Sequence, residues 1–165
     1  MKRKLLPLVA LAGLVLSVQD FTFQAQQPVK GSDDSTKAIA AALTKAKASK
    51  RYVLLNFGAD WCGECRLMTK ILAEPEIAKF LDANFVTVKV EVGHQVGINY
   101  TENNIETTRK YGAFTTAQSI AIPFMVVLDG NGTVLARTNN SEWKHAPAIT
   151  SETVLQALKG WAPKR

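Results

Sequence analysis

The spacing of apolar and polar side chains predicts four strands in this chain of 165 residues. Residues 52–57 form a short apolar run, and residues 85–92 alternate between apolar and polar side chains, as in a strand with one better-buried face. Two more apolar runs, 122–128 and 133–136, flank the Asp-Gly-Asn-Gly sequence at residues 129–132. Because that sequence favours a tight turn, the last two strands are expected to form a hairpin.

Helical spacing accounts for much of the remaining chain. A first helix is expected to start from an N-cap among residues 32–35 and to run to about Lys50. The other helical segments are predicted at residues 66–73, 76–81, 105–111 and 151–161. Pro75 is expected to end or kink the helix before it, and Ser151 to cap the last helix. Residues 93–104 are expected to form a long loop.

The order of these elements, α-β-α-β-α-β-β-α, indicates the α/β class. Strands 52–57 and 85–92 are joined by a helical crossover, so they should be parallel, whereas hairpin strands must be antiparallel. The simplest arrangement is a four-stranded mixed sheet with helices on both faces. We therefore expect one domain with one substantial core.

The start of the chain is typical of a bacterial export signal. Lys2, Arg3 and Lys4 precede an apolar core at residues 5–18, which is shorter than the roughly 20 residues of a membrane-spanning helix. The predicted organisation is a signal peptide at residues 1–25, a linker at 26–32 and a folded domain at 33–165, and the predicted location is periplasmic or secreted. An uncleaved signal that serves as a membrane anchor stays open.

The net charge gives little reason to expect a nucleic-acid partner. The formal charge is +6, and removal of the signal with Lys2, Arg3, Lys4 and Asp20 takes away a net +2 and leaves +4. The remaining basic residues lack interleaved aromatic residues and any recognisable nucleic-acid module. No nucleic-acid partner is therefore expected.

The two cysteines carry the candidate chemistry. Cys62 and Cys65 are the only cysteines, and they lie directly after Trp61, between strand 52–57 and helix 66–73. At the first turn of a helix, unpaired N–H groups and the helix dipole favour an anion such as the Cys62 thiolate. Cys65 follows one helical turn later and can close onto Cys62. The spacing suits a dithiol that alternates between open and bridged forms.

Two other interpretations of the cysteine pair are a zinc site and a structural disulfide. A zinc site would need two more ligands, and His94 and His145 lack the usual His-x₃₋₅-His spacing, so neither a metal nor another cofactor is expected. A purely structural disulfide suits an exported chain, but so small a loop removes little entropy from the unfolded state. The structural disulfide stays open as the less favoured interpretation.

These features resemble the thioredoxin superfamily over residues 33–161. The Trp-Cys-Gly-Glu-Cys sequence at residues 61–65 matches the family's Trp-Cys-Gly-Pro-Cys, the Ile122-Pro123 pair matches its cis-proline, and a glycine-bearing hairpin follows. The chain is most similar to exported bacterial thioredoxin-like proteins and to the C-terminal domain of the transmembrane thiol:disulfide interchange protein. The resemblance implies the thioredoxin-like fold.

The resemblance also implies a role for each matching residue. Cys62 would attack a substrate disulfide, and Cys65 would resolve the mixed disulfide. Pro123 would be cis and face the cysteines, and the backbone of Ile122 would pair with an extended substrate chain. Trp61 would shield one side of the pair, serve as a core aromatic, or do both.

Two departures from the family pattern concern residues that tune the cysteines. Gly63 and Glu64 lie between them, and Glu64 replaces the family's proline. A carboxylate there disfavours the Cys62 thiolate and so favours the bridged form, which would make the protein a stronger reductant. The effect of losing the proline on the reduction potential has no predictable sign. Asn56 stands where the family has a buried aspartate and cannot take up a proton, so Cys65 must lose its proton to water or another group. Lys89 and Glu91 are two candidates for the group that takes up this proton. The favoured interpretation is nevertheless that both residues lie on a solvated edge strand.

The leading functional hypothesis is an exported thiol:disulfide oxidoreductase that acts on protein disulfides in the reducing direction. Its expected partners are protein disulfide substrates and an upstream thiol electron donor, such as a membrane thiol:disulfide interchange protein. A disulfide oxidase, a redox-inert peptide-binding module and a relay for metal or haem maturation are the alternatives.

Overall fold

The computed structural model describes residues 29–30, 35–96, 99–112, 114–116, 119–139, 143 and 146–164. The predicted signal peptide lies outside these residues, and so does the predicted linker except at β1 (Val29–Lys30), which is a short strand. Among the helices of the described residues, none combines the length and the apolar character that a membrane crossing requires.

A four-stranded sheet forms the centre of the molecule, with the order β3-β2-β8-β9. Its strands are β2 (Tyr52–Gly58), β3 (Phe85–Glu91), β8 (Phe124–Leu128) and β9 (Val134–Arg137). β2 is parallel to β3 and antiparallel to β8, and β8 is antiparallel to β9. The predicted mixed sheet and its strand directions are therefore confirmed.

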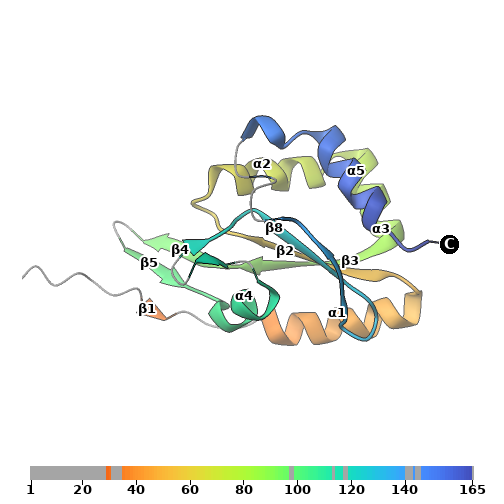
Figure 1. Ribbon diagram of the computed structural model, residues 1–165, viewed down its shortest axis with the longest axis horizontal. Helices are drawn as coiled ribbons and strands as arrows, with labels where there is room; N and C mark the ends of the chain where they lie inside the picture. The colour runs from red at the N-terminus through yellow and green to blue at the C-terminus, as the bar shows by residue number, and fades with distance from the viewer. Residues whose placement is uncertain are drawn as a thin grey trace, which may run out of the picture.

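Helices cover both faces of this sheet, as predicted (Figure 1). On one face lie α1 (Ser35–Ser49) and α4 (Ile105–Tyr111). On the other face lie α2 (Gly63–Leu72), α3 (Pro75–Asn84) and α5 (Ser151–Trp161).

The two-residue period of β2 builds a separate apolar core on each face. Val53, Leu55 and Phe57 pack into the cluster beneath α1, whereas Leu54 packs with Met68 of α2 on the opposite face. All five side chains are fully buried. The central strand is thus almost continuously apolar because both of its faces are covered.

The structure corrects the predicted bounds of the helices after the cysteine pair. α2 begins at Gly63 rather than residue 66, because the Cys62 side chain already caps it. Pro75 is the first residue of α3, where its missing N–H costs nothing, so it starts a helix as well as following one. α3 also continues to Asn84, past the predicted end. Thr150, not Ser151, caps α5, because its hydroxyl accepts a hydrogen bond from the Thr153 N–H at 3.2 Å.

The long loop predicted at residues 93–104 is wrong. β4 (Gly93–Val96) pairs antiparallel with β5 (Asn99–Glu102), and β1 adds to β5 in parallel. Polar strands of this kind form because backbone groups satisfy each other, which side-chain periodicity does not report. Further short elements are β6 (Phe114–Thr116), β7 (Ser119–Ile120) and the 3₁₀ turn Ala146–Ala148.

The turn predicted between the last two strands is organised by Asp129. Its Oδ1 accepts hydrogen bonds from the N–H groups of Asn131 and Thr133, each at 2.8 Å. The backbone hydrogen bond from Thr133 is the largest cause that lowers the Asp129 pKa from 3.8, and the bond from Asn131 adds to it, while desolvation opposes both.

Asp129→Asn is expected to lower the stability of the protein at neutral pH and to matter less in acid. A carboxyl group whose pKa is lower in the folded than in the unfolded state contributes to the free energy of unfolding. This contribution is fully present above the unfolded-state pKa, and it is lost as the pH falls through the folded-state pKa. Urea midpoints of parent and variant, compared at about pH 7 and about pH 2, should therefore converge in acid. A difference of the same size at both pH values would contradict this role.

Candidate functional site

A disulfide at the start of α2 marks the candidate site. Cys62 and Cys65 are bonded to each other, and Cys62 is the N-cap of α2. The Cys62 Sγ accepts a hydrogen bond from the Cys65 N–H at 3.1 Å. When the bridge opens, this donor and the helix dipole both favour a thiolate at Cys62. The predicted position of the pair at a helix start is confirmed.

Trp61 is the exposed part of this site. Its side chain is 44% exposed, whereas Cys62 and Cys65 are only 5% and 6% exposed and join the apolar cluster beneath α1. The disulfide therefore lies at the margin of the core, beside an accessible aromatic surface. Of the two interpretations of Trp61, a shield for the pair fits this exposure better than a core aromatic.

The predicted substrate-binding pair precedes β8. Phe124 of β8 is opposite Phe57 of β2, so the residues before β8 lie beside those that follow β2. Ile122 packs against the cluster that contains both cysteines, Pro123 is buried, and the peptide bond between them is cis. The topology thus brings Ile122 and Pro123 to the end of the sheet where α2 begins.

A hollow of about 360 Å³ lies next to Cys65 and contains the predicted tuning residues Asn56 and Lys89. These two residues are partners in the β2–β3 register. The complete lining is Asn56, Gly58, Ala59, Asp60, Cys65, Arg66, Thr69, Lys70 and Lys89. Because the hollow is open and polar side chains such as Asn56, Asp60 and Thr69 form part of its lining, water can reach the resolving cysteine.

The two residues between the cysteines lie in the first turn of α2. Gly63 is the first residue of α2, and a β-carbon there would meet only the Arg66 guanidinium at 3.9 Å. Glu64 lies in the first turn, where a carboxylate complements the helix dipole. Arg66 donates to the Asp60 carbonyl at 2.7 Å and holds the connection that leads into the helix.

Sequence reasoning missed Gly58 and misjudged Glu91. A β-carbon on Gly58 would lie 3.4 Å from the Cys65 Cβ and 3.5 Å from its Sγ, so this glycine permits α2 to approach the sheet closely. The signal was a glycine at the end of a buried strand. The solvated-edge interpretation suits Lys89, whose side chain is 61% exposed, but not Glu91, whose side chain is 20% exposed.

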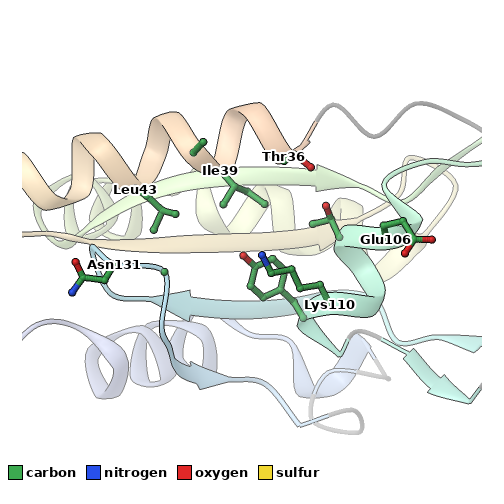
Figure 2. A pocket seen from close by; sticks show the side chains of 10 residues that line it. Thr36, Ile39, Leu43, Glu106, Lys110 and Asn131 are labelled. Atoms are coloured by element: carbon green, nitrogen blue, oxygen red, sulfur yellow. The ribbon is translucent and has the colours of Figure 1, made fainter.

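A second hollow, of about 380 Å³, lies between α1, α4 and the β8–β9 turn (Figure 2). Ile39 and Leu43 of α1 face Lys110 of α4 across it, and Asn131 of the turn lies at one end. It contains neither cysteine nor any predicted site residue. Within the described residues, no group of three or more His, Cys, Asp and Glu side chains is placed to hold a metal ion.

Comparisons with known proteins give matches to thioredoxin-like proteins. The sequence model of the thioredoxin-like family matches residues 34–130. Two rice relatives are a "Thioredoxin H-type" of Oryza sativa subsp. indica, 38% identical over 60 residues, and "Thioredoxin H2-1" of subsp. japonica, 28% identical over 80 residues. These matches cover 36% and 43% of this chain, and 48% and 57% of the relatives, so the chain spans about half the length of the curated relatives that it matches.

Solved structures give longer matches. A disulphide isomerase from Xylella fastidiosa Temecula1 is 26% identical with a TM-score of 0.63, over 77% of this chain and 90% of that one. The oxidised C-terminal domain of DsbD from Neisseria meningitidis is 19% identical with a TM-score of 0.53, over 82% and 99%, and shows the fold alone. With the family match over more than half of its length, the chain belongs to the thioredoxin-like family.

Proposed function

We propose that this protein is an exported thiol:disulfide oxidoreductase that reduces or exchanges disulfides in protein substrates. The observation that carries the proposal is the Cys62–Cys65 disulfide, with Cys62 as the N-cap of α2 beside the exposed Trp61. The likeness to a protein named as a disulphide isomerase supports it. Location in a bacterial periplasm, after removal of residues 1–25, rests on the export signal in the sequence.

The cycle moves two electrons from the dithiol to a client disulfide. The Cys62 thiolate attacks one client sulfur, and the other client sulfur leaves and takes up a proton. Cys65 then loses its proton and attacks the Cys62 Sγ, which releases the second client thiol and forms the Cys62–Cys65 bridge. An upstream thiol donor then reduces the Cys62–Cys65 bridge back to the dithiol. A membrane thiol:disulfide interchange protein is one candidate for this donor.

Client binding is assigned to the surface around the bridge. Trp61 offers apolar contact area next to the sulfurs. We assign the backbone of Ile122 to pairing with an extended client segment, because Ile122 precedes β8 at the end of the sheet where α2 begins.

Two measurements test this function. Reduced protein should accelerate insulin reduction, and equilibration with glutathione should give a potential nearer to the thioredoxin value of about −270 mV than to the oxidase value of about −120 mV. A potential at the oxidising end would overturn the reducing direction. Absence of insulin reduction, together with unimpaired peptide binding, would instead favour the redox-inert binding module.

Glu64→Gln is expected to raise the reduction potential by up to about 30 mV. Removal of the carboxylate stabilises the Cys62 thiolate and hence the reduced form of the protein. A change of one unit in the pKa of the Cys62 thiol corresponds to about 30 mV in the reduction potential of this two-electron couple. The measurement is the glutathione equilibrium of parent and variant. Glu76→Gln makes the same charge change in the first turn of α3 and should leave the potential unchanged. Equal shifts in both variants would contradict a local effect of Glu64.

A further inference from the structure

A carboxylate occupies the sheet face below Cys65. Glu91 is the register partner of Gly58, and partners in parallel strands direct their side chains to the same face. Gly58 faces Cys65, since a β-carbon there would lie 3.5 Å from the Cys65 Sγ. Neighbouring strands are about 4.8 Å apart, so a single water can bridge Glu91 and Cys65.

Glu91 is held by one oxygen and free at the other. Its Oε2 pairs with Lys89 Nζ at 3.0 Å, and Lys89 lines the hollow beside Cys65. Its Oε1 is buried and has no hydrogen-bond partner among the described residues. A buried carboxylate oxygen without a donor is costly, so a water that donates a hydrogen bond to it is favoured.

The neighbouring position on β2 offers no proton acceptor. Asn56 lines the same hollow as Cys65, and its amide does not take up a proton. The step that releases the client nevertheless requires Cys65 to lose a proton. Glu91, whose side chain is 20% exposed and whose Oε1 is buried, is therefore the carboxylate on this face whose geometry suits the task.

We propose that Glu91, held in place by Lys89, accepts the Cys65 proton through a bridging water. This proposal rests on the proposed function. The proton passes from the Cys65 Sγ to the water and from the water to Glu91 Oε1, while the Cys65 electron pair forms the bond to the Cys62 Sγ. The bond between Cys62 and the client sulfur breaks, and the client thiolate takes up a proton from Glu91 or from solvent.

Oxidised glutathione is a suitable probe, because at saturating concentration the attack by Cys65 limits the oxidation of the reduced protein. Stopped-flow fluorescence of the exposed Trp61 follows this step. Glu91→Gln is expected to slow it by about tenfold or more, since general bases contribute about 10²–10⁴ and solvent replaces part of that. Glu106→Gln, an exposed carboxylate on α4 paired with Arg109, should stay within about twofold of the parent.

The pH profile separates proton transfer from a structural role. In Glu91→Gln the rate should keep rising with pH where the parent levels off, because hydroxide replaces the missing acceptor. The other charged groups around the hollow are Lys89 on the same strand, Asp60 after β2, and Arg66 and Lys70 on α2. These groups are unchanged in the variant, so a parent-like rate and profile would overturn the proposal.

A rescue variant guards against misfolding. Glu91→Gln combined with Asn56→Asp places a carboxylate in the hollow beside Cys65 and should recover most of the lost rate. Loss of folding would not be repaired by a carboxylate on a different strand, so failure of the rescue overturns the proposal. If circular dichroism shows that Glu91→Gln is unfolded, Glu91→Asp is used and should give an intermediate rate.

Alkylation gives a readout that needs no client. In a Cys62→Ala background, Glu91→Gln removes a negative charge near Cys65, so the pH of half-maximal reaction with iodoacetamide should fall. An unmoved profile would mean that the two groups are uncoupled and would overturn the inference. A moved profile in a protein that fails to reduce insulin would refute the proposed function but not this coupling.

Discussion

Replacement of Cys62 by serine is expected to lower the rate of insulin reduction by about a thousandfold or more, because it removes the sulfur that attacks the client. Cys62 holds the N-cap position of α2, where a serine hydroxyl also caps well. The bridge that is lost in this variant closes a loop of only a few residues. In the chain-entropy account its loss lowers the free energy of unfolding by about 2 kcal/mol or less. The variant should therefore fold but be inactive.

Cys65→Ser is the matched comparison, since it removes the same bridge but keeps the attacking sulfur. A client should then stay attached to Cys62 as a mixed disulfide, because the release step has lost its nucleophile. Mass spectrometry of protein incubated with a cell-envelope extract would identify the trapped clients. Full insulin reduction by Cys62→Ser, or client adducts on Cys65 of the Cys62→Ser variant with none on Cys62 of the Cys65→Ser variant, would contradict the assigned roles.

The central sheet could be predicted because each of its strands carries its own signal. The apolar run of β2 reflects burial by helices on both of its faces, and the alternation in β3 reflects burial on one face. The turn at Asp129 joins β8 to β9. β4 and β5 could not be predicted in this way, because their pairing is a backbone interaction between polar segments. The start of α2 was misplaced for a different reason, since the cap is a cysteine rather than a typical capping residue.

The candidate site divides in the same manner. The closure of Cys65 onto Cys62 was expected from their spacing, and a position for Lys89 near Asn56 was implied by the family resemblance. The partial burial of Glu91 could not be predicted, because residues from a later part of the chain cover the end of the edge strand. The Asn104 side-chain amide donates to the Glu91 carbonyl at 2.7 Å, so the segment after β5 folds back over β3.

Phe57→Ala is expected to lower the free energy of unfolding by about 3–5 kcal/mol. Phe57 is fully buried at the end of β2, and its ring packs against Phe124 and Tyr111 at centroid distances of 5.9 and 6.2 Å. The substitution removes the ring from the centre of the cluster and leaves a cavity between β2, β8 and α4. Urea unfolding of the oxidised protein measures the loss.

Leu135→Ala is the control, because Leu135 lies on β9 with 47% of its surface exposed and should change stability by no more than about 0.5 kcal/mol. The cluster around Phe57 also contains Cys62 and Cys65, so its loosening should raise the exposure of both sulfurs in the reduced protein. Faster alkylation of the reduced Phe57→Ala variant than of reduced Leu135→Ala would show that this core restricts access to the dithiol. Equal unfolding free energies for the two variants would contradict the assignment of Phe57 to the centre of the cluster.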